Sequence, residues 1–203
     1  MRVKKLAYAL GAEILDVDIT RPLDEATIQA IRAAWLEHLV LLIRGQNITP
    51  EQHIAFSRRF GELELHPNKY NHHHEHPEVY VVTNKMVDNR PSDTRSVGRR
   101  WHSDGAYKLK PSMGSLLYSG EIPPVGGDTL FANMYLAYEA LSPKLKEVLE
   151  RLHALNDRGA AQNNRNVDPA RVAERLKLTP PVINPVDRKS TRLNSSHTDI
   201  SRM

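Results

Sequence analysis

The stretch Trp101-His102-Ser103-Asp104 is the most informative part of this chain, and Gly126-Gly127-Asp128-Thr129 follows it about two dozen positions later. Residues two apart in an extended strand project to the same side, so His102 and Asp104 can present an imidazole nitrogen and a carboxylate oxygen to one metal ion. One nitrogen and one hard oxygen ligand, with positions left open, are what a facial two-His-one-carboxylate iron(II) centre requires. The pair therefore predicts half of a non-haem iron site, and a second His must come from elsewhere.

Metal-free alternatives account for the same residues. A buried His hydrogen-bonded to a carboxylate, or a catalytic His-Asp dyad, would show the spacing of His102 and Asp104. For Thr129, the alternative is a β-branched residue that simply suits a strand. The pair alone leaves these alternatives open.

Four segments, taken in order, resemble the taurine/phenoxyacetate (TauD/TfdA) family of iron(II)- and 2-oxoglutarate-dependent dioxygenases. They are Gly11-Ala12-Glu13-Ile14 with Asp18-Ile19-Thr20-Arg21-Pro22-Leu23, Phe60-Gly61-Glu62-Leu63 with His66-Pro67, Trp101-His102-Ser103-Asp104, and residues 123–133 with Gly-Gly-Asp-Thr. Each segment alone is a weak signal. Four such segments in the family's order over residues 11–186 argue against a chance resemblance and favour the metal site.

The resemblance implies a role for each candidate residue. His102 and Asp104 would hold Fe(II), Thr129 would help to bind a carboxylate of the cosubstrate 2-oxoglutarate, and His66 would contact the substrate. A structural His before Pro in a loop is an equally good account of His66. The family's reaction consumes O2 and 2-oxoglutarate, releases succinate and CO2, and hydroxylates a small, anionic substrate such as a sulfonate, a sulfate ester or an aryloxy acid.

Substrate identity and competing functions stay open at this point. Lys69 and Gly98 stand where taurine dioxygenase carries a Tyr and an Asn, which argues against taurine itself. One competing function is a cupin-type metal oxygenase that does not use 2-oxoglutarate. Another is a non-catalytic jelly-roll binding module, and the Gly-Gly-Asp-Thr motif disfavours both.

Local sequence patterns predict a mixture of short strands and helices. We expect helices after the caps Asp24, Thr49, Ser142 and Asp168, the last running through Leu176. Expected strands cover residues 11–19, 39–43, 79–83, 115–118 and 129–131. Periodicity supports only a mixed α/β chain. The resemblance implies an α+β, mainly β fold, a double-stranded β-helix (a cupin-like jelly roll) with flanking helices.

Histidines outside the motifs, and the polar stretch before His102, are interpreted structurally. His38, His53 and His153 are expected on helices. The run from His72 to His76 is interpreted as a polar loop, since adjacent residues alternate in direction and cannot readily surround one ion. Residues 85–100 are expected to form either a lid over the site or a solvent-exposed connection.

The end of the chain does not resemble the family. Residues 187–197 match the in-frame translation of a common sequencing-library adapter, so we interpret residues 187–203 as an adapter-derived tail. A native polar terminus is the alternative. Residues 1–186 would then be the N-terminal portion of a dioxygenase domain whose jelly roll is incomplete. The distal His and the 2-oxoglutarate-binding Arg would lie beyond it, and we expect this fragment to be inactive.

Composition limits the class of protein. The chain has 203 residues, is 40% hydrophobic and has no apolar run near twenty residues, so no membrane span is expected. Without cysteine, thiolate metal sites and disulfides are excluded, and a cytoplasmic location is expected. Without the tail, 24 basic residues face 22 acidic ones, which gives no electrostatic case for nucleic acid. The expected partners are a small-molecule substrate and O2, and a homo-oligomer stays open.

Overall fold

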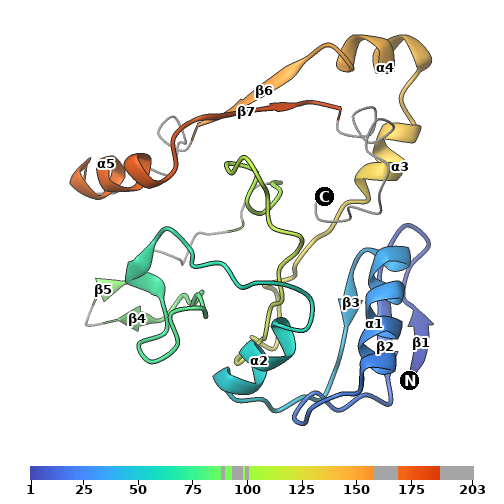
Figure 1. Ribbon diagram of the computed structural model, residues 1–203, viewed down its shortest axis with the longest axis vertical. Coiled ribbons are helices and arrows are strands. Elements are labelled where there is room, and N and C mark those ends of the chain that lie inside the picture. The colour runs from blue at the N-terminus through green and yellow to red at the C-terminus, as the bar shows by residue number, and fades with distance from the viewer. Residues whose placement is uncertain (88–89, 93–97, 99–100, 158–168, 188–203) are drawn as a thin grey trace. The chain divides into compact units, whose positions relative to one another are not determined.

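A computed structural model describes residues 1–87, 90–92, 98, 101–157 and 169–187 (Figure 1). The chain divides into two compact units. Unit 1 comprises Met1–Leu63 and Leu116–Ser142, and unit 2 comprises Glu64–Ser115 and Pro143–Met203. No helix of the described residues has the length and the apolar character that a membrane crossing needs.

Unit 1 is built on a three-stranded sheet with the order β1-β2-β3 (Figure 1). Strand β1 (Arg2–Lys5) pairs antiparallel with β2 (Ala12–Leu15), which pairs parallel with β3 (Leu41–Leu42). Helix α1 (Glu25–His38) connects β2 to β3 and contacts both strands. The buried apolar side chains on α1 and β2 form its core, namely Ile28, Ile31, Ala34, Ala12 and Ile14.

The two N-terminal helices begin where their caps predict. Asp24 accepts a hydrogen bond from the Thr27 amide at 2.6 Å at the start of α1. Thr49 and Gln52 form a reciprocal capping box at the start of α2 (Pro50–Ser57). The expected strand at residues 39–43 is shorter, because Leu39 adopts a positive φ of 68° and caps α1 instead.

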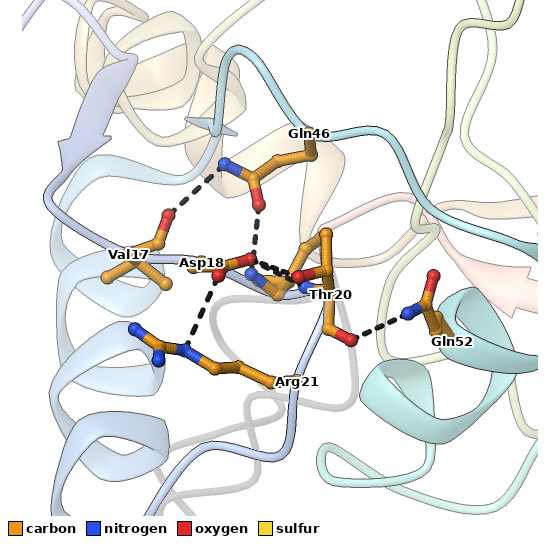
Figure 2. Close-up of polar contacts among 7 residues, drawn as sticks. Val17, Asp18, Thr20, Arg21, Gln46 and Gln52 are labelled. Atoms are coloured by element: carbon orange, nitrogen blue, oxygen red, sulfur yellow. Dashed lines mark hydrogen bonds and ion pairs between the residues drawn. The ribbon is translucent and has the colours of Figure 1, made fainter.

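Polar side chains fix the Asp18-to-Leu23 segment in unit 1 (Figure 2). The Asp18 carboxylate accepts hydrogen bonds from the amide and the hydroxyl of Thr20, at 3.0 and 2.6 Å, and pairs with Arg21 at 3.4 Å. Gln46 donates to the Val17 carbonyl at 3.1 Å and accepts from the Ile19 amide at 2.9 Å. Its amide therefore pairs with the backbone as a neighbouring strand would.

Gln46→Ala is expected to lower the free energy of unfolding by about 1–2 kcal/mol, because two partly buried backbone groups lose their partner. Thermal or urea denaturation measures the effect. Gln29→Ala is the matched control, since Gln29 is exposed on α1 and its side chain donates a hydrogen bond to the exposed Glu25 carboxylate, not to a partly buried backbone group. Equal losses in the two variants would contradict the role of Gln46.

The partly buried His53, on α2, is expected to make the stability of unit 1 depend on pH. Its ring centroid lies 6.3 Å from that of Tyr118. Burial lowers the pKa of His53 below its usual value of 6.5, and a backbone hydrogen bond with Leu116 opposes part of this shift. The unfolded chain then binds the proton more readily, so stability is expected to fall as pH decreases below 6.5. Urea unfolding at pH 7.5 and 5.5 checks this, and His53→Gln should show a smaller difference between the two.

The remaining elements are short. Helix α3 (Met134–Glu139) belongs to unit 1 and begins at the cap Asn133. Unit 2 contains the 3-10 helix η1 (Lys69–Asn71), the hairpin of β4 (Met86–Val87) and β5 (Arg90–Pro91), α4 (Pro143–Leu149), β6 (His153–Asn156), α5 (Pro169–Leu178) and β7 (Val182–Pro185). Strands β6 and β7 pair antiparallel. The helices expected after Ser142 and Asp168 are confirmed, each with a proline at its first position.

Several expected strands are wrong. Residues 115–118 and 129–131 are irregular, and residues 79–83 contribute only the isolated bridge between Tyr80 and His72. A strand exists only where a second segment supplies hydrogen-bond partners over several residues; no described segment forms a ladder with residues 115–118 or 129–131, and residues 71–73 pair too briefly with residues 79–81 to make a strand. The mixed α and β character is confirmed, whereas the three small sheets among the described residues do not show the jelly roll directly.

Two smaller predictions also change. His153 lies in strand β6, not on a helix. Residues 86–91 contain a short hairpin, so the stretch at 85–100 is not wholly irregular; most of its remainder, with the proposed lid, lies outside the described residues.

Candidate metal centre

The predicted ligand pair converges in unit 2. His102 Nε2 lies 3.2 Å from Asp104 Oδ1, and the two side chains are 53% and 62% exposed. The backbone here is irregular and turns at Asp104, so the pair meets without the extended strand that the sequence suggested. The convergence therefore comes from the turn, not from strand geometry.

The separation of the two atoms fits two ligands of one ion. Donors bound about 2.1 Å from a metal on adjacent octahedral positions lie about 3 Å apart. The observed 3.2 Å is close to this value, and an imidazole and a carboxylate are two of the three protein donors of a non-haem iron site. The residues present thus fit the metal that the sequence predicts.

The Asp104 carboxylate has a second partner, which the sequence did not predict. Ser115 Oγ donates a hydrogen bond to Asp104 Oδ2 at 2.7 Å. The two residues lie eleven positions apart in the chain, and no helical or strand period links positions so far apart. Only the closure of the intervening loop reveals the contact.

Gly105 and Ser112 close that loop. Gly105 has a φ of +69°, and a Cβ there would lie 3.2 Å from both the amide nitrogen and the Oγ of Ser112. The Glu64 carboxylate accepts hydrogen bonds from Ser112 Oγ at 2.6 Å and from Lys108 Nζ. Burial alone would raise the pKa of Glu64, but these contacts lower it overall, so Glu64 is an ionised anchor for the loop.

Gly105→Ala is expected to destabilise the loop by about 1–2 kcal/mol, because the left-handed conformation is costly for a residue with a Cβ and Ser112 crowds the site. Thermal denaturation measures the loss. Gly120→Ala is the control, since a Cβ there meets nothing within 4 Å and its φ is not positive. A Gly105→Ala variant as stable as Gly120→Ala would refute the proposed crowding.

His66 is held by local contacts. Its Nδ1 accepts a hydrogen bond from the Asn68 amide at 3.1 Å, and its carbonyl accepts one from His72 Nε2 at 2.7 Å. The centroid of its ring lies 4.0 Å from that of the Tyr80 ring. These contacts match the structural account of a His before Pro. A substrate contact of His66 stays a prediction. Lys69, at one of the positions that differ from taurine dioxygenase, pairs with Glu174 at 2.9 Å.

Thr129 belongs to unit 1, whereas His102, Asp104 and His66 belong to unit 2. Thr129 is exposed and follows Gly126 and Gly127, whose φ angles are +78° and +76°. The chain bends at Pro124 and Val125, and both glycines then adopt the left-handed conformation, so the turn predicted at residues 123–127 is confirmed. The strand is not, and the contact of Thr129 with 2-oxoglutarate stays a prediction.

A third metal ligand is not found in the described part of the chain, where no group of three or more His, Cys, Asp or Glu side chains could hold an ion. The run of histidines does gather its rings: His73 lies 4.7 Å from His74 and 5.3 Å from His76 between ring centroids. A turn brings these rings together, since the His73 amide bonds the Val79 carbonyl.

Comparison with known proteins decides the family. A family model described as "Taurine catabolism dioxygenase TauD, TfdA family" matches residues 2–201. The chain belongs to this family. The match includes residues 187–201, so the adapter-derived tail stays a prediction. Asp187 is the only residue of this tail in the described part of the chain, and it is buried, with 3% of its surface exposed.

Curated TauD/TfdA relatives are identical to the chain at about a third of the aligned positions. The alpha-ketoglutarate-dependent 2,4-dichlorophenoxyacetate dioxygenase of Cupriavidus pinatubonensis is 33% identical over 165 residues, 74% of this chain and 57% of the relative. The alpha-ketoglutarate-dependent sulfate ester dioxygenase of Pseudomonas putida is 30% identical over 179 residues, 87% of this chain and 56% of the relative. The chain thus spans little more than half the length of these relatives.

A solved structure resembles the TauD/TfdA chain over most of its length. The crystal structure of AAD-2 in complex with Mn(II) and N-oxalylglycine superposes with a TM-score of 0.72 and 26% sequence identity, covering 91% of this chain and 66% of that one. The sequence-based family assignment is confirmed.

Proposed function

We propose that the whole protein is an Fe(II)- and 2-oxoglutarate-dependent dioxygenase that hydroxylates a small anionic organic substrate. One observation carries the proposal: in a member of the TauD/TfdA family, His102 Nε2 and Asp104 Oδ1 lie at the separation expected of two ligands on one ion. The reaction converts substrate, 2-oxoglutarate and O2 into hydroxylated product, succinate and CO2, so that one oxygen atom enters each organic product.

The described residues supply part of this chemistry. We assign His102 and Asp104 as metal ligands, the Asp104 carboxylate offsetting charge on the ion. Bound Fe(II) would supply the redox chemistry that couples decarboxylation to hydroxylation. Thr129 would donate its hydroxyl hydrogen bond to a 2-oxoglutarate carboxylate. N-oxalylglycine, bound with Mn(II) in the AAD-2 structure, is 2-oxoglutarate with NH in place of a CH2, which supports the same cosubstrate here.

The domain architecture and the missing groups follow as proposals. We propose that residues 1–186 are the N-terminal portion of a jelly-roll dioxygenase domain and that residues 187–203 do not belong to it. The third metal ligand would be a His, and an Arg would bind 2-oxoglutarate. Both would lie in the part of the whole protein that corresponds to the portion of the relatives not covered by this chain. Cytoplasmic location and a homo-oligomeric assembly stay predictions.

The candidate substrates are sulfonates, sulfate esters and aryloxy acids, because relatives are named for dioxygenases of a sulfate ester and of an aryloxyacetate, and the family for taurine. Hydroxylation beside a sulfonate sulfur or an ether oxygen gives a product that falls apart. Lys69 and Gly98 argue against taurine, so a panel of the three classes, with taurine as one member, is the appropriate screen.

Consumption of 2-oxoglutarate by the whole protein, measured with each substrate, tests the proposal. Substrate-dependent succinate that matches hydroxylated product supports it. Oxygen uptake without 2-oxoglutarate would favour the cupin-type oxygenase instead. Substrate binding without any oxygen uptake would favour the binding module, and either result overturns the proposed function.

A further inference from the structure

The Asp104 carboxylate has different surroundings at its two oxygens. Oδ1 faces His102 Nε2 at 3.2 Å, whereas Oδ2 accepts the hydrogen bond from Ser115 Oγ at 2.7 Å. The Asp104 side chain is 62% exposed, so packing alone does not hold the plane of the carboxylate. The serine hydroxyl therefore distinguishes two otherwise equivalent atoms.

The loop between the two residues brings Ser115 back to Asp104. The Lys108 amide bonds the Gly105 carbonyl at 2.9 Å, and Gly105 lies against Ser112. Glu64 holds both Lys108 and Ser112 by hydrogen bonds. These contacts hold the loop between Asp104 and Ser115, so the bond between the two residues follows from the local fold and not from one adaptable side chain.

We propose that Ser115 is a positioning residue of the metal centre: its hydroxyl holds Oδ2 of Asp104 away from the ion and leaves Oδ1 as the ligand beside His102. The inference rests on the proposed function, because it needs a metal between His102 and Asp104. A carboxylate held in this way binds through one oxygen and keeps further positions around the ion open. Partners of this kind fix the orientation of ligating groups in metal sites.

Manganese binding by the 203-residue chain tests the inference without any turnover. MnCl2 is titrated while the ring-proton signal of His102 is followed by NMR, since paramagnetic broadening reports even weak binding at that ring. His102→Ala assigns the signal. Ser115→Ala is expected to raise the apparent Kd by about tenfold or more, the usual consequence of losing a hydrogen bond to a ligand.

Three further variants separate positioning from a general structural role. Ser115→Thr keeps the hydroxyl and should retain the Kd of the unmodified chain, and Ser115→Cys, a weaker donor, should fall in between. Ser119→Ala, another exposed serine in the same irregular stretch, should change nothing. Circular dichroism checks that each variant keeps its fold, and the graded series remains decisive if Ser115→Ala does not fold.

The outcomes distinguish the inference from the function on which it rests. If manganese broadens His102 equally in the unmodified chain and in the Ser115 variants, the positioning role is overturned and the proposed metal centre stands. If millimolar manganese leaves His102 unbroadened in the unmodified chain, the metal centre and the positioning role fail together.

Discussion

His102→Ala in the whole protein is expected to abolish succinate formation, with a loss of more than about a hundredfold, because the imidazole is one of three protein groups proposed to hold the metal. Asp104 Oδ1 lies 3.2 Å from His102 Nε2. The Asp104 carboxylate occupies its own position on the ion, so it cannot supply the ligand that is lost with the imidazole. Decarboxylation of 2-oxoglutarate labelled at C1 gives the most direct measurement, since released labelled CO2 reports turnover even when the substrate is unknown.

His153→Ala is the matched control for this substitution. His153 is an exposed histidine in strand β6 of the same unit, and it has no assigned role in the reaction. The control should retain full turnover and full metal content, measured by elemental analysis after removal of free metal. If His102→Ala also keeps both, His102 is not a ligand and the proposed centre is wrong.

The parts of the fold that were predicted correctly have local causes. Helices α1 and α2 begin at Asp24 and Thr49 because each cap bonds an amide only three residues ahead, and such contacts can be seen in the sequence. The turn at Gly126 and Gly127 is equally local, since both residues adopt a positive φ that glycine permits.

The incorrect strands have non-local causes. Residues 115–118 and 129–131 have the composition of strands, but hydrogen-bond partners from elsewhere in the chain decide whether a strand forms. The same limit applies to the site. Spacing suggested His102 and Asp104, whereas Ser115 depends on loop closure through Gly105 and Ser112, which no short-range pattern encodes.

The 203-residue chain on its own is expected to form no succinate from 2-oxoglutarate and Fe(II) above the protein-free background. Its described residues bring together one imidazole and one carboxylate, and no third metal-binding group joins them. Two protein ligands hold an ion weakly, and without the proposed Arg the cosubstrate loses its strongest carboxylate contact. Succinate measured by mass spectrometry, with ascorbate present to keep iron reduced, gives the result.

If residues 187–203 are foreign to the gene, as we propose, the matched comparison replaces them with the residues that the parent gene encodes after codon 186. This longer protein is expected to produce succinate, and its His102→Ala variant is expected to lose that activity, which ties the gain to the proposed centre. Robust turnover by the 203-residue chain would show that its own residues complete the site. If the sequence after residue 186 of the longer protein contains no histidine, the proposed third metal ligand does not exist. The dioxygenase assignment would then fail.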